Sequence, residues 1–193
     1  MNNQDQEYRE IELMDGRRVR ARPVERSDAD LLMAFFEGIT PESQRFMHGF
    51  RFDRETAKRI AGTLDDRTWY RVVVVDRTES DERIVGYSWI QPLEAQDAKP
   101  FLGIGLVDEF TNAGLGRALL RLMIRDAREV FGLDRLWLGV FADNPRAIRA
   151  YEAAGFRQDP DTPPKDFDGR IEVYMVACTG RQQRDVERTA KEK

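Results

Sequence analysis

Cysteine and histidine are nearly absent from this chain, whose 193 residues include one of each, Cys178 and His48. A lone cysteine cannot close an internal disulfide, and a structural zinc site needs about four nitrogen or sulfur ligands. Catalysis by a histidine-activated serine or cysteine would depend on His48 alone, which we interpret as a packing or surface residue. We interpret Cys178 as a small buried residue at a strand end. No metal site is predicted.

Long apolar runs and an excess of basic charge are also missing. The longest apolar pieces are short, such as residues 72–75, whereas a membrane-spanning helix needs about 20 residues. The 31 Lys and Arg are outnumbered by 35 Asp and Glu, and the net charge of -4 repels a nucleic-acid backbone. The first ten residues are polar, unlike a signal peptide. We expect a soluble cytoplasmic protein with no membrane or nucleic-acid partner.

Apolar residues make up 41% of the chain, which suffices for one buried core, and the length is that of one domain. We expect a polar N-terminal segment over residues 1–16, one domain over 17–179 and a charged, disordered tail over 180–193. Residues 1–10 and 180–193 lack apolar periodicity, so both ends are expected to trail.

Hydrophobic periodicity predicts an order of strand, helices, antiparallel meander and a final βαβαβ unit. This is an α/β protein with a central mixed sheet of six or seven strands flanked by about four helices. The strands are expected over residues 19–24, 70–75, 84–90, 101–107, 136–141, 156–158 and 171–178. The helices are expected over residues 27–38, 54–64, 114–131 and 145–154.

One segment, residues 107–117, joins a predicted strand to the long amphipathic helix. Gly114 and Gly116 allow the backbone to approach a ligand closely. Unpaired N–H groups at the helix start, the helix dipole and Arg117 together suit a pyrophosphate. Taken alone, the segment is equally consistent with a tight turn that binds nothing.

A second segment, N-P-R-A-I-R-A-Y-E-A-A-G-F over residues 144–156, opens another helix with Asn as N-cap and Pro in the first turn. The pairing of this segment with Gly114-x-Gly116 resembles the two central motifs of GNAT-type N-acetyltransferases. The resemblance extends over roughly residues 19–178 and implies the GNAT acyltransferase fold.

That resemblance implies acetyl-CoA, bound in a gap between the strands at 101–107 and 136–141. Backbone groups of the first strand would pair with the pantetheine, and residues 112–117 would hold the pyrophosphate. Tyr151 would act as the catalytic acid, because a phenol can protonate a departing thiolate at modest cost. A core aromatic is the alternative for Tyr151, and a plain helix cap is the alternative for Asn144. The implied acetyl-CoA contacts are Leu106, Val107, Asn112, Ala113, Gly114, Leu115, Gly116, Arg117, Asn144, Ala147 and Tyr151.

The chain also departs from the family pattern. Thr111 stands where many members carry Gln or Arg, and residues 101–105 lack the Glu that often serves as base. Asp108 and Glu109 are interpreted as solvent-facing loop residues, because bound phosphates would repel them. The base therefore stays unidentified, with solvent as one option. Three further carboxylates are open alternatives: Glu37, Glu42 and Glu94.

The leading hypothesis is transfer of an acetyl group from acetyl-CoA to a primary amine, on a small molecule or a protein lysine. A weaker resemblance of residues 38–46 to bacterial protein-lysine acetyltransferases bears on the acceptor. The rivals are a non-catalytic acyl-CoA sensor and a scaffold that binds no coenzyme. A homodimer is left open. Beyond Arg117, the basic stripe of the long helix is interpreted as a solvated face: Arg121, Arg125 and Arg128.

Overall fold

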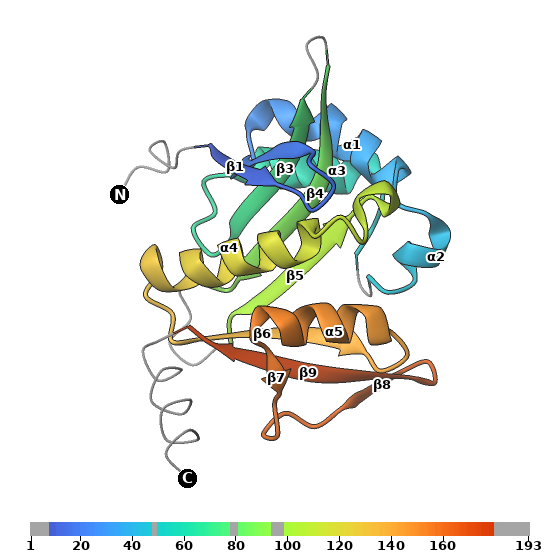
Figure 1. The fold of residues 1–193 in the computed structure, drawn as a ribbon, viewed down its shortest axis with the longest axis vertical. Coiled ribbons are helices and arrows are strands. Elements are labelled where there is room, and N and C mark those ends of the chain that lie inside the picture. Colours follow the sequence, from blue (N-terminus) through green and yellow to red (C-terminus); the bar gives the residue numbers. More distant parts are fainter. Residues whose placement is uncertain (1–7, 48–49, 78–80, 94–98, 180–193) are drawn as a thin grey trace.

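The computed structural model describes residues 8–47, 50–77, 81–93 and 99–179 (Figure 1). Within these residues nine strands form one mixed sheet in the order β1-β2-β3-β4-β5-β6-β9-β7, and β8 pairs with β9. The strands are β1 Arg9–Glu12, β2 Arg18–Pro23, β3 Tyr70–Arg77, β4 Glu82–Gln91, β5 Phe101–Leu106, β6 Arg135–Phe141, β7 Arg157–Gln158, β8 Lys165–Phe167 and β9 Arg170–Cys178. The helices are η1 Arg26–Asp28, α1 Ala29–Glu37, α2 Pro41–Gln44, α3 Arg54–Gly62, η2 Asp108–Phe110, α4 Leu115–Glu129 and α5 Pro145–Ala154.

The predicted α/β class with a central mixed sheet is confirmed, but nine strands exceed the expected six or seven. Part of the difference is β1, which pairs antiparallel with β2. The expectation that residues 1–10 trail is therefore wrong for Arg9 and Glu10. A four-residue edge strand, only half-buried on one face, carries too weak a pattern for sequence reasoning to detect. Residues 1–7 and 180–193, and with them the predicted tail, lie outside the described residues.

Strands β1 to β5 form an antiparallel meander with its core on both faces. The first six residues of β3 are buried throughout, because helices cover the sheet on either side. Figure 1 shows α1 and α3 behind these strands and α4 in front of them. Phe35 and Phe36 of α1 and Leu119 and Met123 of α4 are at most 1% exposed. This half of the molecule supplies a rigid support for β5.

The sheet opens between β5 and β6. β5 pairs with β4 along its full length, whereas its parallel pairing with β6 is limited to Phe101 and Trp137. Beyond this point the two strands separate, so each leaves backbone groups that the other does not satisfy. α4 follows β5 and α5 follows the turn after β6, and the two helices pack together beside the opening (Figure 1).

Cys178 is exposed, which contradicts its interpretation as a buried residue. Side chains alternate along β9, and Met175 and Ala177 occupy the buried face. The last residue of the strand falls on the opposite face, opposite Arg135 of β6. Here the strand was predicted correctly and the face was not. His48 and Glu94 lie outside the described residues.

Candidate active site

A cavity of about 490 Å³ lies at the opening between β5 and β6. It is bounded by β5, the turn after it, the start of α4 and one face of α5, with residues near α2 at its other end. Eight of the eleven predicted contacts line it: Leu106, Asn112, Gly114, Gly116, Arg117, Asn144, Ala147 and Tyr151. The other three have side chains turned into the core, each at most 8% exposed: Val107, Ala113 and Leu115.

The turn before α4 presents backbone donors to this cavity. Gly114 is the N-cap residue of α4, with φ of 86°, and it has no side chain with which to cap the helix. The first bond of the helix is donated by Ala118 to the Gly114 carbonyl. The N–H groups of residues 115–117 therefore have no acceptor within the helix, at its electropositive end. Asn112 also has a positive φ, of 68°, which completes the tight path of the turn.

Asp108 fastens the start of this turn to α2. Its carboxylate accepts hydrogen bonds from the Thr40 N–H, at 2.9 Å, and from the Ser43 hydroxyl, at 2.5 Å. Burial acts to raise the pKa of Asp108, but these hydrogen bonds outweigh it and hold the pKa below its usual value. Asp108 is half-buried and fully engaged, so its role is structural rather than that of a base.

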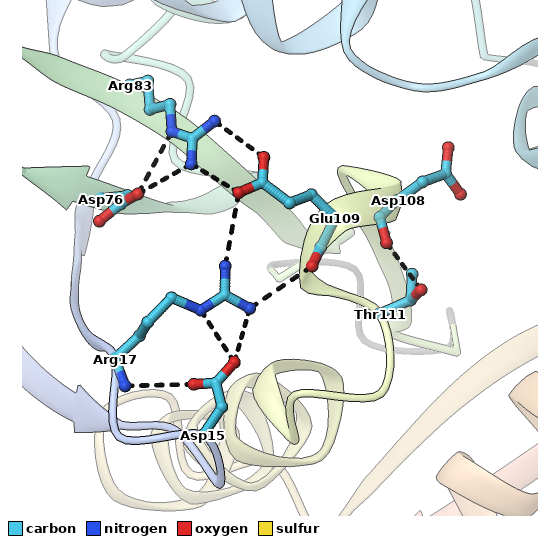
Figure 2. Close-up of polar contacts among 7 residues, drawn as sticks. All are labelled: Asp15, Arg17, Asp76, Arg83, Asp108, Glu109 and Thr111. Atoms are coloured by element: carbon cyan, nitrogen blue, oxygen red, sulfur yellow. Dashed lines mark hydrogen bonds and ion pairs between the residues drawn. The ribbon is translucent and has the colours of Figure 1, made fainter.

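Glu109 fastens the turn on its other side, between two arginines (Figure 2). Arg83 of β4 contacts both carboxylate oxygens at 3.0 Å, and Arg17 lies 3.6 Å away. The guanidinium of Arg17 also stacks over the buried ring of Phe110, 3.9 Å from its centroid. The hydrogen bond from Arg83 lowers the pKa of Glu109. As predicted, Glu109 is exposed to solvent, and its ion pairs make it part of the support of the turn.

Only one edge of β5 is available to a ligand. Val107 donates to Val85 of β4, and its carbonyl accepts from Phe110. Because backbone groups alternate between the two edges of a strand, Ile104 and Leu106 direct theirs towards β6, where the sheet is open. The predicted backbone contact thus fits Leu106, whereas both groups of Val107 are already bonded. Ile104, which the sequence analysis did not select, also lines the cavity.

α5 forms the opposite wall. The Asn144 side chain caps the helix by accepting from the Ala147 N–H at 3.1 Å, and it also lines the cavity. The Tyr151 ring packs edge-on against Phe156 with centroids 6.1 Å apart. Its hydroxyl has no hydrogen-bond partner within the described part of the chain. Burial raises the pKa of Tyr151 to about 12, so the phenol stays protonated at neutral pH, as a proton donor must.

Three arginines surround the cavity: Arg117 from α4 and Arg146 and Arg149 from α5. None of them forms an ion pair with any residue that the structure describes. The two arginines of α5 were missed by the sequence analysis, although their spacing of three places them on one face of the helix that Asn144 begins. No Asp or Glu is among the residues lining the cavity. Its charge therefore suits a phosphorylated ligand.

The geometry agrees with comparisons to known proteins. A family model described as an acetyltransferase (GNAT) domain matches residues 18–157. The chain belongs to this GNAT acetyltransferase family. The described part of the chain has the mixed α/β sheet of GNAT proteins of known structure. The spermidine N-acetyltransferase of Vibrio cholerae, solved with CoA and spermine, superposes with a TM-score of 0.68 at 17% identity, covering 83% of this chain and 95% of that one.

Two curated GNAT relatives share higher identity over shorter stretches. A mycothiol acetyltransferase of Corynebacterium efficiens is 33% identical over 89 residues, which are 46% of this chain and 29% of the relative. The ribosomal protein bS18 alanine N-acetyltransferase of Escherichia coli K12 is 40% identical over 85 residues, 42% of this chain and 55% of the relative. The chain thus spans about half, or less, of the curated relatives that it matches.

The described residues include neither a membrane-spanning helix nor a metal-binding cluster. None of the described helices combines the length and the apolar character required to cross a bilayer. Within the same residues, no three His, Cys, Asp or Glu side chains gather closely enough to hold a metal ion.

Proposed function

We propose that this protein transfers the acetyl group of acetyl-CoA to a primary amine by direct attack on the thioester. The observation that carries the proposal is the set of groups that line one cavity. They include the start of α4, where the N–H groups of residues 115–117 are unbonded, and three arginines without ion pairs, which suit a pyrophosphate. The same cavity holds the protonated Tyr151 hydroxyl and residues of the open edge of β5.

Each part of the cavity has a chemical task in this reaction. Backbone groups of Ile104 and Leu106 would pair with the pantetheine arm and steady the charge that develops on the thioester oxygen. Tyr151 would donate its proton to the departing sulfur at a modest cost, because the reference pKa of a thiol, about 8.5, lies below that of a phenol, about 10. The uncapped start of α4 would keep the coenzyme in place while the amine approaches.

The acceptor belongs to the class of primary amines. The named relatives act on mycothiol, on the alanine of a ribosomal protein and on spermidine, so both small molecules and protein termini occur within the family. A protein lysine is a third acceptor of the same chemistry. A non-catalytic acyl-CoA sensor is the second candidate function, because no carboxylate lines the cavity to serve as base.

A thiol-release assay with acetyl-CoA tests the proposal, using spermidine, an alanine-initiated peptide and a lysine-containing peptide as acceptors. Calorimetry with acetyl-CoA alone measures binding in parallel. We expect binding and turnover with at least one amine. Binding without turnover on any amine would replace the enzyme by the sensor, and absence of binding would overturn both.

A glycine substitution links the binding to this cavity. A Cβ at Gly116 would lie 3.2 Å from Leu106 Cδ1 and would intrude on the cavity, so Gly116→Val should weaken acetyl-CoA binding at least about tenfold. Gly62→Val is the matched control, because a Cβ there meets nothing within 4 Å. Equal affinities for the two variants would place the coenzyme elsewhere.

A further inference from the structure

A carboxylate lies near the opening between β5 and β6, although it does not line the cavity itself. Glu172 of β9 lies opposite Phe141 of β6, and Tyr174 lies opposite Gly139. Because alternate residues of a strand share a face, Glu172 and Tyr174 project to the same side of the sheet. The rings of Tyr174 and Phe101 of β5 are 6.0 Å apart, so this is the face that Phe101 also occupies.

Gly139 makes room for this carboxylate. A Cβ placed on Gly139 would lie 2.6 Å from Glu172 Oε1 and 2.8 Å from its Cδ. The carboxylate therefore covers the backbone of Gly139, in space that any side chain at that position would occupy. Gly139 follows Trp137, the β6 residue that pairs with β5, by two positions, so the carboxylate lies where the two strands begin to separate.

An aromatic side chain occupies the equivalent place on β5. Gly103 follows Phe101 by two residues, as Gly139 follows Trp137, and a Cβ on Gly103 would collide with the indole of Trp89. The indole and the carboxylate thus cover two glycines on opposite sides of the opening, on one face of the sheet. An aromatic ring and a carboxylate are the pair of groups that recognises an organic cation.

Glu172 is half-buried and forms no ion pair with any of the described residues. Lys165 lies opposite it on β8, but the two charged groups are not within ion-pair distance. The cation on the same strand, Arg170, instead binds Asp143 at 2.8 Å and stacks on the ring of Phe141. Burial and the adjacent Glu172 carboxylate raise the pKa of Tyr174 to about 12, so this neighbour is neutral. A half-buried carboxylate that has a neutral tyrosine as its hydrogen-bonding neighbour and no ion pair favours a cationic ligand.

We propose that Glu172 binds the primary ammonium group of the acceptor and takes its proton, with Trp89 as the facing aromatic wall. The proposal rests on the acetyl transfer inferred above and supplies the base that the cavity lining lacks. It also defines the acceptor as a cation rather than a neutral or anionic molecule. Glu172 stands far from both sequence motifs, which is why the sequence did not reveal it.

The reaction releases two protons from the amine nitrogen and exchanges a C–S bond for a C–N bond. One ammonium proton passes to Glu172 and then to solvent, which leaves a neutral amine. Its lone pair forms the C–N bond to the thioester carbonyl carbon, and the C–S bond breaks with its electrons on sulfur. Tyr151 donates a proton to sulfur and is reprotonated by the second proton that the nitrogen releases.

Glu172→Gln keeps the shape of the side chain and removes its charge, with Glu152→Gln on the exposed side of α5 as the matched control. With the amine that the wild type acetylates fastest, we expect kcat to fall about 100-fold at neutral pH. The calorimetric Kd for acetyl-CoA should stay unchanged in both variants. The deficit of Glu172→Gln should narrow as the pH rises towards about 10, where more of the amine arrives neutral.

Gly139→Ala provides a second variant, which displaces the carboxylate without removing it and should reproduce part of the loss. A kcat for Glu172→Gln within about threefold of the wild type would overturn the proposal. So would a deficit that is constant with pH in a variant whose melting temperature is unchanged, because a missing base is relieved at high pH.

A measurement of amine binding shows whether the ammonium site and the acetyl transfer fail together or separately. Calorimetry of spermidine against the protein saturated with coenzyme A should show at least about tenfold weaker binding for Glu172→Gln. If the wild type binds spermidine in this Glu172-dependent way but acetylates no amine, the acetyl transfer fails and the ammonium site stands. If the wild type neither binds nor acetylates an amine, both fail.

Discussion

The buried charged side chains that join strands and helices, here called the framework, have close ionic partners, whereas the charged side chains around the cavity do not. In the framework, Arg22 of β2 forms two hydrogen bonds of 2.7 Å to Asp28, and the two side chains are 4% and 1% exposed. Asp126 of α4 is 1% exposed and accepts from Arg9 of β1 and from the Tyr70 hydroxyl of β3. These groups satisfy one another and connect elements that are distant in sequence.

The arginines and the tyrosine hydroxyl around the cavity have no such partners. Arg117, Arg146 and Arg149 form no ion pair with the described residues, and the Tyr151 hydroxyl accepts and donates no hydrogen bond among them. All three arginines are exposed, so leaving them unpaired costs the folded state little. The buried charges of the framework thus bind one another, whereas those around the cavity are free to bind a ligand.

The largest expected effect is a loss of folding stability when a buried ion pair of the framework is broken. Asp28→Ala leaves the buried Arg22 with two less buried carboxylate partners, Glu82 at 3.0 Å and Glu25 at 3.9 Å, and should lower the free energy of unfolding by about 3 kcal/mol. Chemical denaturation measures the change. Asp30→Ala in α1, the helix that follows η1, removes an exposed pair with Arg54 and should cost less than about 1 kcal/mol. Acetyl-CoA affinity of the folded fraction should not change. Equal destabilisation by the two variants would contradict the comparison.

Tyr151→Phe, in the cavity, should lower activity without lowering stability. Because the hydroxyl has no partner in the described structure, its removal should leave the melting temperature unchanged while kcat falls about 100-fold. The Kd for acetyl-CoA should stay nearly constant. Tyr8→Phe, at a position 60% exposed, is the matched control. An unchanged kcat would remove Tyr151 from the mechanism.

The loss of stability at acid pH should depend on hydrogen-bonded carboxylates of the framework such as Asp159. Burial acts to raise the pKa of Asp159, but hydrogen bonds from Thr162, Lys99 and Trp137 lower it to about 2, against roughly 3.9 in an unfolded chain. The resulting stability, about 2 kcal/mol, is present above the unfolded pKa and is lost as the pH falls from about 4 to about 2. Unfolding free energies measured across this range should depend less on pH in Asp159→Asn. Identical pH profiles would contradict the assignment.

The smallest effect is expected on acetyl-CoA affinity when one of the exposed arginines that line the cavity is removed. Arg149→Ala should weaken acetyl-CoA binding about threefold to tenfold, and added salt should reduce the difference because the contact is exposed. Arg121→Ala removes the same charge from a helix face outside the cavity and should leave the Kd unchanged. Calorimetry at two salt concentrations distinguishes them. Equal effects would mean that net charge, rather than position, governs binding.

Much of the fold could be predicted because its signals are local. The apolar stripe of α4 gave a helix over residues 114–131, observed as Leu115–Glu129, and the Asn-Pro start and Gly155 end of α5 were both correct. Seven of the eight predicted contacts that line the cavity belong to a turn or helix whose geometry its own sequence dictates, and the eighth, Leu106, ends strand β5.

The errors share a different cause, since each depends on what a residue faces. The backbone groups of Val107 are already bonded to Val85 and Phe110 although its neighbour Leu106 lines the cavity, and Cys178 is exposed at the end of a strand expected to bury it. β1 was missed because its partner strand, rather than its own pattern, stabilises it.

Local sequence is enough to specify the turn before α4 and the cap and spacing of α5, which together form the wall that the phosphate end of a coenzyme would meet. Hydrogen-bonding geometry and side-chain spacing act within about ten residues, so these features can be read from contiguous segments. The separation of β5 and β6 after one pair, and the position of Glu172 over Gly139, become visible only once the whole sheet is assembled. Those facts depend on strand register and on glycines facing particular side chains across the sheet, which no single segment encodes.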